Sequence, residues 1–310
     1  SQNTGGPMVS SVIPPSHTKE AFVGMQLETT RQVLSQDVIN DYIQRTGDTH
    51  PWYTGESPFG KPLVPAMLTY NWPGQPNSTW YPENIYGNLH ARHEFEWYQP
   101  AFAGDSLVGH RVIVDRYEKR GRVYLVPELT LVRESDGAVI LKQRHHQSFL
   151  IDGESQQESN TVAVDKSREK QSARQRSNHP SEADSIESFG PISRFVDKAV
   201  CDQYSGIKPN YHNDLETAED LGFPDIVVQG TLSLAYICEL LTQRFGAGLF
   251  VGGRLDIKFV NVLWVGENIS AKGSLQEVTG EGSRTRGQST VWTEKDDGTV
   301  TIVGTASALI

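Results

Sequence analysis

The sequence predicts an α+β fold in which an antiparallel sheet wraps around a buried helix. Strand-like segments follow one another after a helical segment instead of alternating with helices, which favours an antiparallel sheet over a doubly wound one. The turns Ser135-Asp136-Gly137 and Asp296-Asp297-Gly298 separate neighbouring strand-like segments, as hairpins require. A spacing shared by the two halves of the chain predicts that this unit occurs twice.

Two independent landmarks carry the repeated spacing. Residues 97–105 and 259–267 both contain an aromatic residue, then apolar residues, then a Gly followed by an acidic residue. The runs are offset by 162 residues (97 to 259), and the same offset separates Tyr42 from Tyr204, each of which heads a polar loop with a Ser/Thr-Gly pair. These matches indicate duplication of a unit of roughly 110–150 residues.

Each copy is expected to begin with a helix, at Ser35–Thr46 and at Ile192–Ser205, followed by a Gly-containing loop and a second, more apolar helix. Alternating patterns and turn residues place the strands that come next. We expect them at His93–Tyr98, Ser106–Glu118, Arg122–Glu134, Val139–Ile151, Leu255–Val262, Asn268–Val278, Arg284–Glu294 and Thr299–Leu309.

The second copy contains the most strongly patterned helix, which begins near Gly230 and ends near Phe245. Its apolar residues recur at steps of three and four, as a buried helix requires. Gly230 and Thr231 stand at its start, where unpaired backbone N–H groups can hold a carbonyl oxygen or an oxyanion. The loop before it carries His212, which makes this region a candidate acid/base site; the alternative is an ordinary surface or capping histidine.

Composition divides the chain into an arm at 1–25, a first unit at 26–151, a linker at 152–191 and a second unit at 192–310. The linker is expected because its residues are almost all polar, so that few of them can enter a core. The arm has neither the basic start nor the apolar run of a secretory signal.

The formal net charge of -10 argues against nucleic acid and anionic membranes as partners. No apolar run approaches ~20 residues, so a transmembrane span is not expected. Cys201 and Cys238 fit a reducing compartment, which predicts a cytoplasmic protein, with an organelle as the alternative.

Two runs carry a family resemblance. Residues 46–53 read Thr-Gly-Asp-Thr-His-Pro-Trp-Tyr, and residues 205–212 read Ser-Gly-Ile-Lys-Pro-Asn-Tyr-His. Both resemble the motif Ser/Thr-Gly-Asp-x-Asn-Pro-x-His of MaoC-like, (R)-specific enoyl-CoA hydratases, in proteins built as a double hot-dog. The likeness extends over 26–151 and 194–310. In that family a His-Gly-Met run begins the central helix, and here its counterparts are Pro65-Ala66-Met67 and Gln229-Gly230-Thr231.

The resemblance implies two antiparallel sheets, each wrapped around a central helix. It also implies a site in which Asp and His act on water or on a proton beside a thioester while the Gly N–H polarises the carbonyl. The first copy keeps Asp48 but has Tyr53 in place of the His, and the second keeps His212 but has Ile207 in place of the Asp. Neither copy therefore holds the complete pair.

From these residues we predict a lyase of the hydratase/dehydratase type that acts by acid/base catalysis, without a cofactor, on an activated carbonyl substrate: an acyl-CoA thioester or a related compound. The alternatives are an isomerase or cyclase that uses the same pocket without CoA, or a non-catalytic acyl-binding protein. A homodimer is a further possibility. The predicted catalytic residues are His212, Asp48 and His50; the predicted substrate-binding residues are Gly230, Gln229, Asn210, Tyr211, Tyr53 and Trp72.

Three features have competing interpretations. Asp48 and His50 can converge as a catalytic pair, or Asp48 can cap a turn while Pro51 holds His50 extended. The insert Pro73–Asn88 can be an ordered loop or a wall for a hydrophobic substrate. The pairs at 90 and 93 and at 145 and 146 are histidines on apparent strands, where neighbours point to opposite faces, so no metal site is expected.

Overall fold

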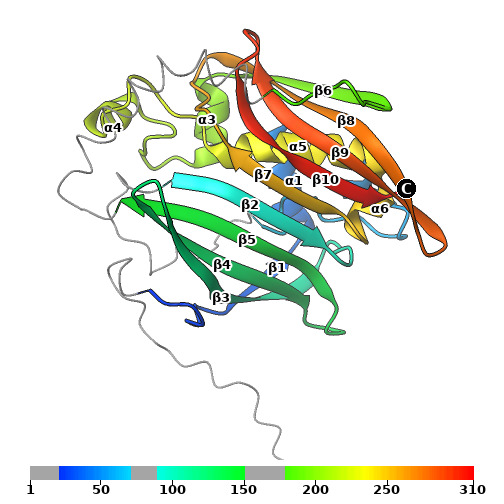
Figure 1. Cartoon of the computed structure of the whole chain (residues 1–310). Helices are drawn as coiled ribbons and strands as arrows, with labels where there is room; N and C mark the ends of the chain where they lie inside the picture. The colour runs from blue at the N-terminus through cyan, green and yellow to red at the C-terminus, as the bar shows by residue number, and fades with distance from the viewer. Residues whose placement is uncertain (1–20, 71–88, 151–178) are drawn as a thin grey trace, which may run out of the picture.

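The computed structural model describes residues 21–70, 89–150 and 179–310. In this part of the chain ten strands form one antiparallel sheet, in the order β1-β3-β4-β5-β2-β7-β10-β9-β8-β6 (Figure 1). The strands are β1 (Thr30–Leu34), β2 (Leu89–Trp97), β3 (Asp105–Lys119), β4 (Arg122–Arg133), β5 (Val139–Leu150), β6 (Glu187–Val196), β7 (Arg254–Phe259), β8 (Glu267–Glu281), β9 (Arg284–Lys295) and β10 (Val300–Leu309).

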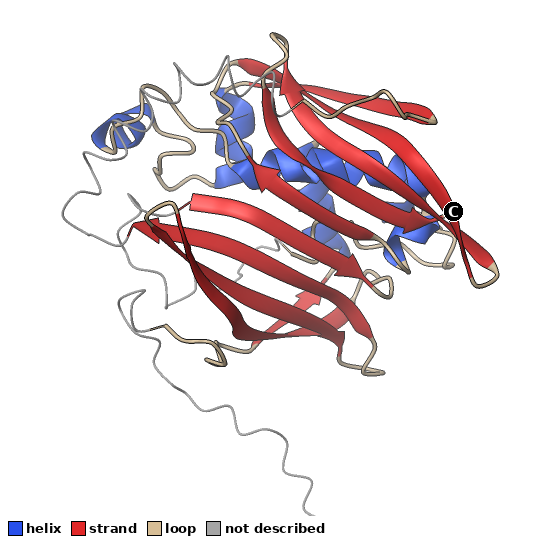
Figure 2. Cartoon of the chain, in the orientation of Figure 1, coloured by secondary structure: helices blue, strands red, loops and turns tan. Residues whose placement is uncertain are grey.

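The two halves of the sheet have the same internal order. The first half runs β1-β3-β4-β5-β2, and the second, read from the opposite edge, runs β6-β8-β9-β10-β7. They join where β2 pairs with β7, from Arg92 opposite Lys258 to Glu96 opposite Arg254. Figure 2 shows the helices grouped on one side of this continuous sheet.

Equivalent turns confirm the duplication that the 162-residue offset predicts. Gly104 donates its N–H to the Leu34 carbonyl and Gly266 donates to the Val196 carbonyl, both at 2.7 Å. Both glycines have positive φ, 89° and 83°, a conformation that other residues rarely adopt. The acidic residue that follows each glycine accepts a backbone N–H three residues before it.

Two of the helices begin at matching side-chain caps. Ser35 accepts from the N–H of Val38 at the start of α1, and Asp197 accepts from the N–H of Val200 at the start of α3, which satisfies donors that have no partner inside the helix. The helical segments are α1 (Gln36–Thr46), the 3-10 turn η2 (Pro51–Tyr53), α3 (Lys198–Ser205), α4 (Leu215–Asp220), α5 (Gly230–Phe245) and α6 (Ala247–Phe250).

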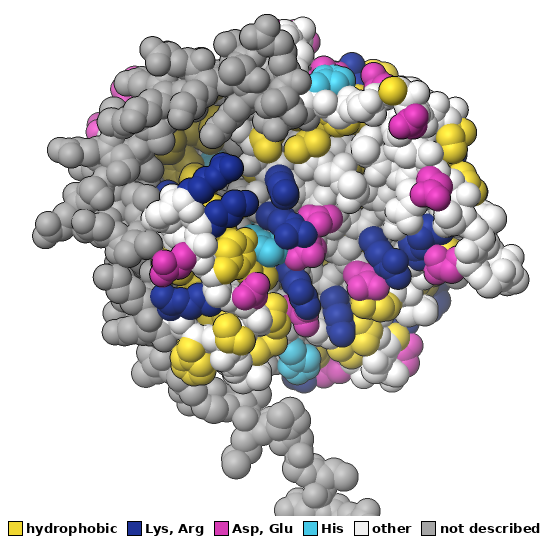
Figure 3. Space-filling view, in the orientation of Figure 1, with side chains coloured by type: hydrophobic (Ala, Val, Ile, Leu, Met, Phe, Trp, Pro, Cys, Tyr) yellow, Lys and Arg dark blue, Asp and Glu magenta, His cyan; other side chains and the backbone are white. Residues whose placement is uncertain are grey.

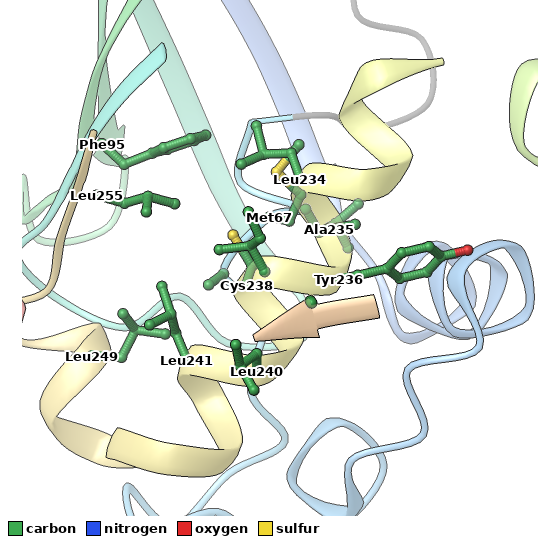
Figure 4. Packing of buried hydrophobic residues seen from close by; sticks show 14 of the residues in the cluster. Met67, Phe95, Leu234, Ala235, Tyr236, Cys238, Leu240, Leu241, Leu249 and Leu255 are labelled. Atoms are coloured by element: carbon green, nitrogen blue, oxygen red, sulfur yellow. The ribbon is translucent and has the colours of Figure 1, made fainter. Parts of the chain in front are cut away.

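Helix α5 lies at the centre of the hydrophobic core. Nearly all of its residues are buried, and it packs against β6, β8, β9 and β10 of its own half and against α1 of the other half. Figure 4 shows Phe95 of β2 beside Leu255 of β7, and Met67 close to Cys238 of α5. One core cluster therefore includes residues of both halves.

Two expectations about the sheet and its helices require correction. The strands form one ten-stranded sheet instead of two, because β2 and β7 each offer an edge with unpaired backbone groups and satisfy one another. Positions 66–70, where the second helix of the first copy was expected to begin, form turns, and the residues after them, 71–88, lie outside the described part of the chain.

The expected helix at Ile192–Ser205 is half strand. Residues up to Val196 belong to β6 and pair with β8, and the helix begins at Lys198 after the Asp197 cap. Because β6 begins at Glu187, the second half starts within the range that the sequence assigned to the linker. The equivalent strand β1 was also not expected, whereas the other eight strands lie where the sequence placed them.

In the described part of the chain, no helix combines the length and the apolar character needed to cross a membrane.

Candidate functional site

The loop before His212 is held by two asparagine side chains. Asn213 is buried, donates to the carbonyls of Gly206 (2.7 Å) and Lys208 (3.1 Å), and accepts the N–H of Asn210 at 2.8 Å. Asn210 donates to the carbonyls of Ser205 and Lys208, and its Oδ1 accepts the N–H of His212 at 2.9 Å. These bonds replace a regular element and fix the backbone that carries His212.

His212 is held in one tautomer. Its Nδ1 lies 2.8 Å from the carbonyl oxygen of Val227, which can only accept, so Nδ1 carries the proton and Nε2 carries the lone pair. Burial lowers the pKa of His212 to about 4, and the bond to Val227 opposes this only in part. At neutral pH the imidazole is therefore an uncharged base.

The start of α5 lies close to this histidine along the chain. Gln229 stands at the N-cap but gives no side-chain cap, because its Oε1 accepts from the hydroxyl of Ser205 at 3.0 Å. The first-turn N–H groups of α5 therefore donate no hydrogen bond to the capping side chain, as a carbonyl-binding role requires. A Cβ on Gly230 would lie 2.8 Å from the Phe259 ring, so glycine permits this close approach.

Tyr211 and Ile207 occupy different environments in the same loop. The Tyr211 ring lies 3.8 Å from the His212 ring and stacks on Phe223, so Tyr211 forms a wall beside the base. Ile207, at the position of the family's Asp, is 101% exposed. This position points into solvent and contributes nothing to a site at His212.

In the first half, Asp48 is buried, with 4% of its surface exposed, and its carboxylate bonds to Tyr53. The Tyr53 hydroxyl donates to Asp48 Oδ2 at 3.1 Å, and the backbone N–H of His50 donates to Oδ1 at 3.3 Å. Burial raises the pKa of Asp48 to about 6, while the bonds from Tyr53 and His50 and the charge of Arg194 act in the opposite direction. Tyr53 thus stands in the place of the family's His and binds the family's Asp.

The His50 imidazole does not bond to Asp48. Its Nδ1 accepts the backbone N–H of Trp52 at 3.2 Å, and His50 is the N-cap of η2. Burial lowers the pKa of His50. Asp48 therefore caps a turn by accepting the N–H of His50, His50 caps η2 in addition, and the two side chains do not form the expected pair.

Two ionisable residues near Asp48 were not found from the sequence. Glu239, on α5, accepts two bonds from Arg194 of β6, at 2.8 and 2.9 Å, and Arg194 also donates to the Gly47 carbonyl at 3.3 Å. Burial and the charge of Asp48 raise the pKa of Glu239 to about 7, while Arg194 opposes the shift. Arg194 therefore links the first motif loop to the central helix of the second half.

The two motif loops form separate groups. Among the described residues, no hydrogen bond or ring contact joins Asp48 to His212, and His212 is not among the groups that shift the pKa of Asp48. Trp72, expected to bind substrate, lies outside the described residues, as does the insert around it.

His90, His93 and His145 lie together, so the expectation that positions 90 and 93 point to opposite faces is wrong. His90 Nε2 is 2.9 Å from His93 Nδ1, and the ring of His145 stacks on His90 at 3.8 Å. Burial lowers the pKa of His90 and of His93 well below the usual range and that of His145 to about 4. His146, the neighbour of His145, faces the other way and bonds to Glu94 and Tyr117.

Comparisons with known proteins agree with this architecture. Residues 21–143 match the family model of the FAS1-like dehydratase domain region. A MaoC domain dehydratase from Chloroflexus aurantiacus is 10% identical with a TM-score of 0.65, covering 97% of this chain and 99% of that one. A MaoC-like dehydratase from Phytophthora capsici is 14% identical, with a TM-score of 0.63 and coverage of 92% and 96%. A Mycobacterium tuberculosis protein with a double hot-dog fold is 10% identical, with a TM-score of 0.62 and coverage of 96% and 99%.

The chain has a double hot-dog fold, like these solved structures. Among curated proteins, none matches the sequence significantly. The segments that contain the two counterparts of the His-Gly-Met run lie at equivalent positions: Val64 donates to the Ala101 carbonyl and Val228 donates to the Leu263 carbonyl, both at 2.9 Å. Ala66 in the first hot-dog half thus corresponds to Gly230 in the second.

The outer face of the double hot-dog sheet carries interleaved charges (Figure 3). A shallow groove there includes Glu94, Glu128, Arg144 and Asp256 among its lining residues. Arg144 pairs with Glu128 at 2.8 Å, and Asp256 pairs with Arg92 of β2 at 2.6 Å. Because these charges are held in ion pairs, we place the candidate site in the region around His212 and not in this groove.

Proposed function

We propose that this protein is a hydro-lyase of the hydratase/dehydratase type that acts on a small thioester or related activated carbonyl substrate, with His212 as its base. The observation that carries this proposal is the bond from His212 Nδ1 to the Val227 carbonyl, which leaves an uncharged Nε2 in a loop beside the start of α5. The MaoC-like fold and the match of residues 21–143 to a dehydratase region support the reaction class.

The proposed reaction needs one base and one oxyanion site. His212 Nε2 removes the proton from the carbon next to the carbonyl, and the backbone N–H of Gly230 stabilises the enolate oxygen that forms. The imidazolium then gives the proton to the departing hydroxyl group, so that a C–H and a C–O bond break, a C=C bond forms and water leaves. Hydration is the reverse sequence.

A second candidate is an isomerase or cyclase that needs the base alone. The exposure of Ile207 favours it, because the carboxylate that assists water in the family has no counterpart beside His212 among the described residues. In this version His212 returns the proton to a different carbon, or an internal nucleophile closes a ring, and no water is added or lost. Substrate then need not carry CoA.

The test uses the full chain with crotonyl-CoA and 3-hydroxybutyryl-CoA as probes. We expect hydration of the first and dehydration of the second, followed by the ultraviolet absorbance of the enoyl thioester. His212→Gln is expected to lower turnover by about 10²–10⁴-fold with little change in acyl-CoA affinity, as loss of a general base does. His110→Gln, at an exposed position of β3, is the matched control.

Each other outcome has a defined meaning. Acyl-CoA binding without turnover, unchanged by His212→Gln, favours a non-catalytic acyl-binding protein. Loss of turnover in His50→Gln but not in His212→Gln moves the site to the first half. Absence of hydration and dehydration together with base-dependent hydrogen exchange next to a carbonyl favours the isomerase or cyclase.

A further inference from the structure

The three clustered histidines lie on the inner face of the first half, on strands β2 and β5. His93 and His145 are directly opposite one another across the two strands. The register shifts between His90 and Arg92, so that Ala91 is an extra residue on β2. This bulge reverses the strand alternation and brings His90 to the same face as His93, which regular strand spacing would prevent.

Two glutamines orient the rings. Gln143 and Gln147 stand two residues to either side of His145 on β5, so all three side chains share a face. Gln143 Oε1 lies 2.5 Å from His93 Nε2, and Gln147 Oε1 lies 2.7 Å from His145 Nε2. An amide oxygen accepts, so each Nε2 carries the proton and each Nδ1 carries a lone pair.

This arrangement resembles the surroundings of a metal-binding imidazole. Metal-ligating histidines commonly donate their other ring N–H to a carbonyl or carboxylate oxygen, which fixes the ring and its tautomer. Here two of the three histidines have such a partner, and the lone pair on Nδ1 of His93 faces Nε2 of His90 at 2.9 Å. One nitrogen from each ring lies within 4.8 Å of the others.

We propose that His90, His93 and His145 bind a divalent transition metal ion of the zinc class. Three neutral imidazoles suit Zn²⁺, Co²⁺, Ni²⁺ or Cu²⁺ and do not suit Mg²⁺ or Ca²⁺, which require oxygen ligands. At a Zn–N distance of about 2.05 Å, tetrahedral ligand nitrogens are about 3.3 Å apart. His90 Nε2 and His93 Nδ1, 2.9 Å apart, are close to this spacing. The ligand nitrogen of His145 lies within 4.8 Å of both, and rotation of its ring brings it closer. Three protein ligands leave a fourth position for water or another group.

The site lies near the region proposed to bind substrate. The ring of Phe259 is 4.5 Å from the ring of His90, and the same Phe259 packs on Gly230 at the start of α5. Tyr70 covers His93 on another side, with ring centroids 4.7 Å apart. A bound ion would therefore fix the wall behind the first turn of α5, and this inference does not depend on the proposed reaction.

The experiment measures metal binding by the full chain after treatment with a chelator. We expect about one equivalent of Zn²⁺ per chain in competition with a chromophoric chelator, and a visible absorption band with Co²⁺ of the intensity of a four-coordinate site. His93→Gln and His145→Gln should each weaken binding at least 100-fold. Gln143→Leu should weaken it about 10–100-fold, as removal of a partner of a ligating histidine does.

His146→Gln is the matched control, because His146 adjoins His145 in sequence but bonds to Glu94 and Tyr117 on the other face. It should bind Zn²⁺ as the parent does. The proposal is overturned if the parent binds no equivalent of Zn²⁺ or Co²⁺, or if His93→Gln and His145→Gln bind as well as His146→Gln. Circular dichroism of each variant identifies loss of fold, and two ligand variants are used so that one failure leaves the other informative.

Discussion

The two motif loops start from the same sequence pattern and end with opposite chemistry. Each follows a helix with a Ser/Thr-Gly pair at its end, Gly47 after α1 and Gly206 after α3. Gly47 has φ 74° and ψ 8°, whereas Gly206 has φ 90° and ψ 177°. The rotation at ψ turns the next peptide around, so Asp48 enters the core while Ile207 enters solvent.

The counterparts of the family's Asp and His are thus separated by backbone geometry as well as by substitution. The first loop buries an acid and satisfies it with Tyr53 and a backbone N–H. The second loop is held open by Asn210 and Asn213 and presents a base. If His212 is the base that we propose, the first loop has a structural role and the second a chemical one.

The largest effect on stability is expected at Asp48. A carboxyl group whose pKa is higher in the folded than in the unfolded chain stabilises the fold when it is protonated, and this contribution is lost as pH rises through the folded pKa. For Asp48 the window runs from the usual value of 3.8 to about 6. A difference of this size corresponds to about 3 kcal/mol. Asp48→Asn should remove it.

We therefore compare the unfolding free energies of the parent and of Asp48→Asn. The difference, parent minus variant, should fall by about 3 kcal/mol between pH 3.5 and pH 7. Urea unfolding followed by tryptophan fluorescence at a series of pH values measures it. Glu239, whose pKa is also raised, remains in both proteins, so most of its contribution cancels. A difference that stays constant with pH would show that Asp48 is ionised as readily in the fold as outside it.

A smaller effect on stability is expected at Asn213, whose hydrogen bonds hold the backbone of the second motif loop. Asn213→Ala leaves two carbonyls and one N–H of the loop without their partner, which costs about 2 kcal/mol. This loop positions His212. Because a small displacement of a catalytic group slows the reaction strongly, turnover should fall by about tenfold or more.

Asn268→Ala is the control for this change, since Asn268 makes one exposed hydrogen bond to Asp296. It should alter the free energy of unfolding by less than about 0.5 kcal/mol and leave turnover unchanged. Equal effects of the two substitutions would mean that the asparagine bonds do not set the position of His212.

The local sequence pattern was sufficient to predict some elements of this molecule and not others. Helix α5 and most strands follow from apolar periodicity, and the 162-residue offset marks equivalent turns. The edge strands β1 and β6 are short or mostly exposed, so they carry little periodic signal. The pair of Arg194 and Glu239 joins residues far apart in sequence. The histidine cluster depends on a bulge at Ala91, and no residue type specifies a bulge.

The smallest effect is expected where sequence alone would predict the largest. Ile207→Asp restores the Asp of the family's motif in the sequence, yet position 207 points into solvent because of the ψ angle of Gly206. The new carboxylate would be fully hydrated and remote from a substrate at His212. We expect hydration of crotonyl-CoA to change by less than about threefold and the unfolding free energy by less than about 0.5 kcal/mol, as for other surface substitutions. A large gain in hydration, measured with the same absorbance assay, would show that this loop turns inward when substrate binds and that the two motif loops differ less than their backbone angles indicate.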